Sequence, residues 1–249
     1  MPQAEFFPGS GGIAIGCCAG SWSMSFDVLA PHYRWMEFLL AGGKLQRCRT
    51  TFLSQVDHCQ NVLIVGEGNG CFLLECRRAL GPARITCLDA SARMLALAHE
   101  RLLAHGLDAL NVQWVQADAL TWTPPAQAFD LIVTHFFLDC FRPEQLERVI
   151  GALAGAASAD ATWLLADFQV PTAGWRRRRA QVVHWMMYTF FRAVTRLPAR
   201  KLTVPDTLLL ANNFILCERQ VSNWGLLRTD KWRRGATTES PDGRILIRG

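Results

Sequence analysis

The sequence lacks the marks of several protein classes. No apolar run reaches the ~18–20 residues that a helix needs to cross a bilayer. The nine cysteines are odd in number and include no CxxC pair, which argues against a structural zinc site, any other metal centre or a disulfide framework. Several cysteines lie within apolar runs, where this residue usually acts as a small hydrophobe, so we expect a cytoplasmic protein in a reducing compartment.

The sequence also has no internal repeat and no low-complexity tract. Half of its 249 residues are hydrophobic, which is enough for one ordered domain with a sizeable core. Residues 1–23 have no basic segment before their apolar piece, and Gly16 breaks that piece, so they do not look like a signal peptide. We interpret residues 1–23 as a flexible leader or a start-site artefact, residues 24–235 as the domain and residues 236–249 as a tail.

Acidic residues are fewer than basic ones, and the net charge is +5. The basic residues concentrate in "WRRRR" (175–179) and "RTDKWRR" (228–234). Such clusters attract nucleic acid or anionic lipid. The alternative, and the commoner case, is a solvated helix face.

Short apolar runs alternate with longer stretches of helical periodicity. The runs expected as strands are residues 61–68, 84–91, 112–118, 129–137 and 161–170. The helices expected between them are residues 70–80, 92–106 and 143–157, and a broken helical pattern covers residues 26–53. This alternation indicates βαβ units and a parallel sheet covered on both faces. The last third predicts a long helix at 176–197, a short one at 206–213, and a hairpin of strands 214–221 and 224–234.

The stretch "NVLIVGEGNG", residues 61–70, ends an apolar run in three glycines spaced two apart. A dinucleotide fingerprint needs G-x-G-x-x-G, but Cys71 stands at the third glycine position. A P-loop needs a Lys followed by Ser or Thr, and this loop has neither. The pattern is therefore G-x-G-x-G. It indicates either a loop that a ligand approaches or a tight strand-to-helix turn without a ligand.

With this loop, the sequence resembles the class I S-adenosylmethionine-dependent methyltransferases. The resemblance implies a Rossmann-like, seven-stranded, mostly parallel sheet with helices on both faces and a C-terminal antiparallel β-hairpin. It also implies that Asp89, at the end of the second strand, accepts the ribose hydroxyls and that Asp118, after the third, accepts the adenine amino group. Taken alone, Asp89 could instead cap a helix and Asp118 could serve a turn. The implied cofactor-binding residues are Tyr33, Gly66, Glu67, Gly68, Gly70, Asp89, Ala90, Ser91, Met94, Asp118, Ala119 and Thr134.

The segment "FDVLAPHYRWMEF" resembles the ubiquinone/menaquinone C-methyltransferases and their small-molecule relatives, in which a tyrosine at the position of Tyr33 lies over the cofactor. One departure concerns the cofactor's ammonium end. The family has an acid two residues before the first glycine, where this chain has Ile64. Glu67, inside the loop, is the candidate substitute.

The fourth strand and the loop after it, "FDLIVTHFFLDCF", lie where an acceptor should meet the methyl group. The candidate substrate residues are His32, His135, Phe136, Phe137 and Asp139, and the candidate catalytic residues are His135 and Tyr33. Either histidine could be a general base or an orienting group, and the two phenylalanines could be core residues. Base-methylating enzymes carry N/D-P-P-Y/F after this strand, whereas this chain has "THFF", so a nucleic-acid acceptor is disfavoured.

The resemblance thus implies methyl transfer from S-adenosyl-L-methionine, with S-adenosyl-L-homocysteine as product, to O, N or C of a small apolar or carboxylate-bearing acceptor. A non-catalytic S-adenosylmethionine-binding scaffold is the main alternative, and an RNA methyltransferase is the weaker one. The aromatic and methionine-rich segment 175–197 could be a lid over the acceptor, a homodimer face, a helix on an anionic membrane, or simply a cover for the sheet.

Overall fold

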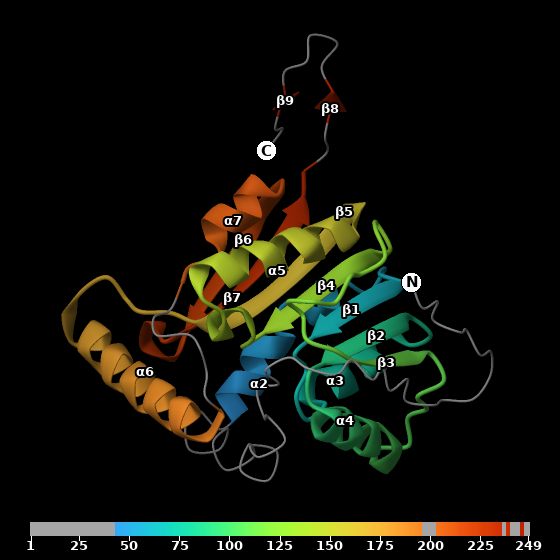
Figure 1. Ribbon diagram of the computed structural model, residues 1–249, viewed down its shortest axis with the longest axis horizontal. Coiled ribbons are helices and arrows are strands. Elements are labelled where there is room, and N and C mark those ends of the chain that lie inside the picture. The colour runs from blue at the N-terminus through green and yellow to red at the C-terminus, as the bar shows by residue number, and fades with distance from the viewer. Residues whose placement is uncertain (1–42, 196–202, 236–237, 240–244, 247–249) are drawn as a thin grey trace.

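The computed structural model of the chain describes residues 43–195, 203–235, 238–239 and 245–246 (Figure 1). The expected leader, residues 1–23, lies outside the described residues, and so do Tyr33 and His32. Within the expected tail, two short strands, β8 (Thr238–Glu239) and β9 (Ile245–Leu246), pair with each other.

A seven-stranded sheet in the order β3-β2-β1-β4-β5-β7-β6 forms the centre of the molecule. Its strands are β1 (Asn61–Val65), β2 (Arg84–Asp89), β3 (Val112–Gln116), β4 (Phe129–His135), β5 (Ala157–Phe168), β6 (Phe214–Ser222) and β7 (Leu227–Arg234). Neighbouring strands from β3 to β5 run parallel, while β7 runs antiparallel to both β5 and β6. The expected Rossmann-like sheet with its C-terminal antiparallel hairpin is confirmed.

Helices cover both faces of this sheet (Figure 1). They are α2 (Gly43–Thr50), α3 (Cys71–Leu80), α4 (Ala92–Ala104), α5 (Pro143–Ala156), α6 (Gly174–Thr195) and α7 (Asp206–Ala211), with short 3-10 turns η2 (Leu53–Gln55), η3 (Leu138–Cys140) and η4 (Asn223–Gly225). Residues of α3 and α4 share one core cluster with the sheet, and residues of α5 and α7 share another. Among the described residues, no helix is both long and apolar enough to cross a membrane.

The apolar run of β1 is explained by burial on both faces. Residues 62–65 are each at most 1% exposed. Successive side chains of a strand point to opposite faces, so Val62 and Ile64 join the cluster with α3, and Leu63 and Val65 join the one with α5. Ile64, where the family has an acid, is therefore a core residue beneath α3.

The hairpin is fixed to α7 by a buried ion network. Asp230 on β7 is fully buried and accepts two hydrogen bonds from Arg219 on β6, each 2.7 Å long. Arg219 also bonds Asp206 of α7 at 2.7 Å, and Arg228 bonds the other oxygen of Asp206 at 2.7 Å. Because a buried carboxylate is costly without partners, this network ties the hairpin register to the position of α7.

We expect Asp230→Ala to lower the free energy of unfolding by about 3 kcal/mol, because it removes two hydrogen bonds of Arg219 and leaves the buried charge of Arg228 with one carboxylate fewer. Urea denaturation measures this change. The matched control is Glu218→Ala on the same hairpin, which removes an exposed partner of Lys231 and should change stability little. Equal losses for the two variants would contradict the role of the network.

Candidate active site

The candidate site lies at the carboxyl ends of the parallel strands. β1 pairs with β2 on one side and with β4 on the other, so the strand order reverses at β1 and β4. Ligands of open α/β sheets bind in the crevice at such a switch point. The glycine loop follows β1 at this point, and His135 ends the neighbouring β4.

All three loop glycines have left-handed backbones, with φ of 69° at Gly66, 68° at Gly68 and 81° at Gly70. A Cβ on Gly70 would lie 2.6 Å from the Cα of Ala98, so this glycine lets α3 approach α4 closely. A Cβ on Gly66 would lie 2.3 Å from a ring carbon of Phe137. Side chains are thus excluded at both positions by the protein itself, before any ligand is considered.

Asp89 joins the glycine loop to the end of β2. Its Oδ2 accepts a hydrogen bond from the Gly68 amide at 3.1 Å, and its Oδ1 accepts one from the Ser91 amide at 2.9 Å. Ser91 in turn caps α4, since its hydroxyl accepts from the Met94 amide at 3.1 Å. The helix-cap role that Asp89 could have played therefore belongs to Ser91. Met94 is buried in the core, whereas Ala90 is exposed.

Asp118 is exposed and begins a turn after β3. Its Oδ1 accepts from the Leu120 amide at 2.9 Å, and its carbonyl accepts from the Trp122 amide at 2.8 Å. Ala119 packs against the core cluster on the α5 side. The turn role that the sequence left open is therefore present, and one carboxylate oxygen performs it.

Glu67 points at the start of α3. Its Oε1 accepts from the amides of Phe72 and Leu73, at 2.8 and 3.0 Å. These amides have no partner within the helix, so the carboxylate caps α3 and lies at its positive end. Burial nevertheless raises the pKa of Glu67 from its ordinary 4.5 to about 7. The carboxylate expected to replace the acid missing at Ile64 is thus engaged by the helix.

His135 is buried at the end of β4, edge-on to the ring of Phe72 with centroids 4.5 Å apart. Neither ring nitrogen has a hydrogen-bond partner among the described residues. Burial, and then the positive charge of Arg49, hold the pKa of His135 well below its usual range. The ring is therefore neutral at physiological pH and has unused hydrogen-bonding capacity.

Arg49, a buried residue of α2, was not predicted from the sequence. Its guanidinium lies over the ring of Phe136, 5.3 Å from the centroid. Its charge acts on both Glu67 and His135, lowering the pKa of each. No local motif marks this arginine, because its place depends on the docking of α2 against β7, where the Cys48 thiol and the Thr229 hydroxyl lie 2.8 Å apart.

The remaining residues expected in the site, at the end of β4 and after it, lie in different environments. The Thr134 hydroxyl accepts from the indole of Trp163 at 2.9 Å, deep in the core. Phe136 has φ of 53° and packs on Phe168, with ring centroids 5.1 Å apart. Phe137 lies against Gly66 and packs on Phe141 instead. The structure therefore brings Phe137 to the glycine loop and Phe136 to Arg49.

Two buried carboxyl groups lie beside this loop. Burial raises the pKa of Asp139, in η3, to about 6. The pKa of Asp167, near the end of β5, is raised well above its usual range by burial and then by the charge of Asp139. Asp167 was not predicted from the sequence, although it carries the signal that marked Asp89, an acid at the end of a buried strand.

A further missed residue is Asn69, within the glycine loop. The residue is 5% exposed, and neither its amide nitrogen nor its amide oxygen has a partner among the described residues. Its carbonyl accepts from Arg101 at 2.8 Å, which fixes the backbone. Buried polar groups are normally satisfied, so an unused amide in this loop suits a polar ligand.

Residues 62–159, from β1 to the start of β5, match the family described as methyltransferase domain. Over these residues the chain is similar to that family. The resemblance to the class I S-adenosylmethionine-dependent methyltransferases is confirmed for the fold and for the matched residues. The finer resemblance to the quinone C-methyltransferases stays a prediction. No curated protein matches the chain.

Several solved structures share the fold. The mitomycin 7-O-methyltransferase MmcR is 16% identical with a TM-score of 0.62, covering 84% of this chain and 60% of that one. A SAM-dependent methyltransferase from Aquifex aeolicus is 16% identical with a TM-score of 0.54, covering 81% and 97%. The N-methyltransferase NodS from Bradyrhizobium japonicum WM9, in complex with S-adenosyl-L-homocysteine, is 17% identical with a TM-score of 0.56, covering 79% and 90%.

This chain is shorter than some of those structures. It spans 60%, 57% and 61% of the first three that it matches. At these identities the likeness shows the fold alone. Among the described residues, no group of three or more His, Cys, Asp or Glu side chains could hold a metal ion.

Glu67→Gln should change how stability depends on pH. The folded pKa of about 7 lies above the ordinary 4.5, so the folded state holds this proton more strongly. The wild-type free energy of unfolding should therefore fall as pH rises through this window, and the glutamine variant should lack that fall. Denaturant melts at about pH 5 and about pH 8 measure the difference. Glu67→Ala, which also loses the cap, should be about 1 kcal/mol less stable than Glu67→Gln at both pH values. Parallel pH curves for wild type and Glu67→Gln would refute the shifted pKa.

Proposed function

We propose that the protein transfers the methyl group of S-adenosyl-L-methionine to an O, N or C atom of a small apolar or carboxylate-bearing acceptor. The observation that carries this proposal is the glycine loop at residues 66–70, joined through Asp89 to the end of β2 at the switch in strand order. The family match over residues 62–159 supports the same reaction.

The residues around the loop fit the cofactor. In the proposed complex Asp89, which already accepts from the Gly68 and Ser91 amides, also accepts the ribose hydroxyls, since an ionised carboxylate has about four acceptor sites. Asp118 holds the adenine end, and the unused amide of Asn69 lies on the loop that faces the amino-acid end. When bound, the cofactor supplies a methyl group already activated on a sulfonium, so the protein's task is chiefly to bind and orient.

Acceptor positioning falls to the residues after β4. Because His135 is neutral, it can accept a hydrogen bond from an acceptor hydroxyl or amine, or donate one to an oxygen. Arg49 places a positive charge beside it, which favours an acceptor that carries a carboxylate. Alignment of this kind can lower a barrier by as much as ~7–11 kcal/mol. Tyr33 and His32 remain proposed contacts outside the described residues.

The names of the structural relatives favour attack by oxygen or nitrogen. MmcR is described as a 7-O-methyltransferase and NodS as an N-methyltransferase. In a neutral acceptor the attacking oxygen or nitrogen carries a proton, and this proton must leave during the transfer. His135 is the proposed first receiver of that proton, directly or through water, and its depressed pKa makes it a weak base.

A non-catalytic cofactor-binding scaffold is the second candidate, and a specific observation favours it. The position that holds an acid in the family is Ile64, which lies in the core, and Glu67 is occupied by the amides of α3. The ammonium end of the cofactor would then meet no carboxylate from either residue. Turnover distinguishes this candidate from the enzyme.

Cofactor binding is tested by thermal shift with S-adenosyl-L-homocysteine. At about 100 times the Kd, a ligand that binds only the folded state adds about 2.7 kcal/mol, which should raise the Tm by roughly 5–10 °C. Asp89→Asn should lose most of this shift, whereas Asp108→Asn, an exposed control that pairs with Arg77, should keep it. The absence of a shift with either S-adenosylhomocysteine or S-adenosylmethionine would count against both candidates.

Turnover is tested with His135→Ala on the best acceptor from a panel of phenols, amines and aromatic acids, with S-adenosylhomocysteine release as the readout. We expect kcat to fall about 100-fold or more with the thermal shift retained. The control His58→Ala alters an exposed histidine and should leave kcat unchanged. Since the pKa of His135 lies well below 6.5, its protonation should not reduce the wild-type rate between about pH 8 and 6.5. Unchanged turnover in His135→Ala would remove this residue from the mechanism.

A further inference from the structure

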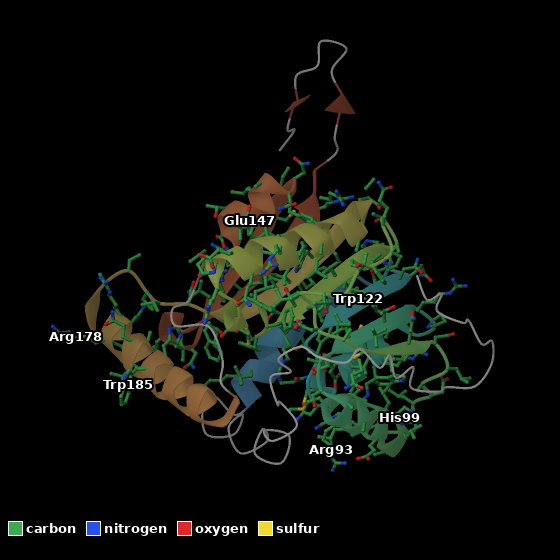
Figure 2. All side chains as sticks on the ribbon, in the orientation of Figure 1. Arg93, His99, Trp122, Glu147, Arg178 and Trp185 are labelled. Atoms are coloured by element: carbon green, nitrogen blue, oxygen red, sulfur yellow. The ribbon has the colours of Figure 1, made fainter. Side chains whose placement is uncertain are left out.

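The outward face of α6 carries an unusual stripe. Trp175, Val182 and Trp185 are 60%, 56% and 67% exposed, and Arg178 lies between them. Their positions follow the spacing i, i+3, i+7 and i+10, which places all four on one side of a helix. In Figure 2, Arg178 and Trp185 project from α6 away from the sheet. Large apolar side chains grouped in this way mark an interaction surface.

The opposite side of α6 is already docked. Ala180 and His184 are 1% and 6% exposed, and Val183 packs against the cluster formed with α2 and β5. The His184 ring lies edge-on to Phe168, with centroids 5.8 Å apart. The orientation of the helix is therefore set by its inner side, and the tryptophan stripe faces away from the protein.

The charged side chains of this helix are all basic. Residues 176–179 are four consecutive arginines, and the 22 residues of α6 contain no Asp or Glu. Arginines 176–178 are exposed, so their charges are available to a partner. The surface therefore combines apolar aromatic side chains with a dense positive charge.

The turn between β6 and β7 adds a further tryptophan beside α6. Trp224 is 53% exposed, and both Lys44 and Arg179 lie 4.8 Å from the centre of its ring. Arg179 also bonds the carbonyl of Asn223 at 3.3 Å, which ties the turn to α6. Asn223 and Trp224 have φ of 51° and 56°, a left-handed conformation that costs free energy in residues other than glycine. The fold thus holds an indole outward, between two cations, at a cost in strain.

We propose that α6 and Trp224 form a docking surface for the anionic face of a lipid bilayer. Trp175, Trp185 and Trp224 suit the headgroup region, where indole rings are enriched because they are apolar and yet donate a hydrogen bond. Arginines 176–178 reach lipid phosphates, and an interfacial helix is held by both contributions together. The proposal goes beyond methyl transfer and does not depend on it.

A second copy of the chain suits this surface poorly. Two α6 helices brought face to face would bring the four consecutive arginines of each (residues 176–179) toward those of the other, with no acidic residue on either helix to balance them. Nucleic acid would satisfy the arginines, but it offers no apolar phase for Val182. An anionic bilayer offers both negative charge and an apolar phase.

Docking at α6 would also orient the candidate site. The inner side of α6 contacts Phe168, and Phe168 packs on Phe136, which follows β4. The bilayer would therefore lie beside the acceptor end of the site, close to where an apolar acceptor would leave the lipid.

The experiment measures co-sedimentation of the full chain with vesicles of phosphatidylcholine alone, or of equal parts phosphatidylcholine and phosphatidylglycerol. We expect binding to the anionic vesicles alone, weakened as salt rises from about 0.1 M to about 1 M. Triple substitution of arginines 176–178 by glutamine should lower the partition coefficient on the order of 100-fold. The double variant Trp175→Ala/Trp185→Ala should lower it about tenfold or more and reduce the blue shift of tryptophan fluorescence.

Matched controls separate this surface from general charge and hydrophobicity. Arg84→Gln/Arg148→Gln/Arg233→Gln removes the same charge from exposed positions on other elements, and Leu103→Ala/Leu110→Ala removes exposed apolar side chains elsewhere. Both should keep wild-type binding, and all variants should keep the wild-type Tm. The proposal is overturned if the wild type does not bind anionic vesicles, or if the controls lose as much binding as the α6 variants. It is also overturned if the tryptophan variant turns a dimer into a monomer while vesicle binding is unchanged.

Discussion

The site depends on one carboxylate. Asp89 accepts amide hydrogens from Gly68 and from Ser91, so a single side chain fixes the loop after β1 relative to the loop after β2. Ser91 then caps α4, and Gly70 allows α3 to pack closely against that helix. The shape of the cofactor end is therefore set by contacts within the protein. A carboxylate can accept several hydrogen bonds, so the same side chain can hold the two loops and also bind a ligand in the proposed complex.

Structural features that depend on local sequence could be predicted well. The strands and helices from β1 to α5, the glycine loop and the closing hairpin follow from periodicity, turn residues and burial, and the structure confirms the resulting sheet. Features that depend on packing could not. Arg49 becomes part of the site through the docking of α2, and Thr134 leaves it because Trp163 takes its hydroxyl. Glu67 looked like a ligand for the cofactor, but the start of α3 engages it.

Burial disfavours the charged form of several titratable groups in the candidate site. Burial raises the pKa of Glu67 to about 7 and that of Asp139 to about 6, and it holds the pKa of His135 low. Each shift has the sign that desolvation produces. The low dielectric that accompanies burial also strengthens the interaction of the Arg49 charge with a nearby anion. Such surroundings would suit the proposed methyl transfer, because that reaction consumes a cationic sulfonium.

The position of β7 has a consequence for how the chain reaches this fold. β7 follows β6 in sequence, yet it lies inside the sheet, between β5 and β6. During synthesis, the edge of β5 therefore stays unpaired until residues 227–234 have left the ribosome, and an open strand edge can pair with other chains. The ion network of Asp230 forms at the same late step, because β7 supplies both Asp230 and Arg228. Completion of the sheet and burial of these charges are thus one event, and a chain interrupted before β7 would expose a long interior strand.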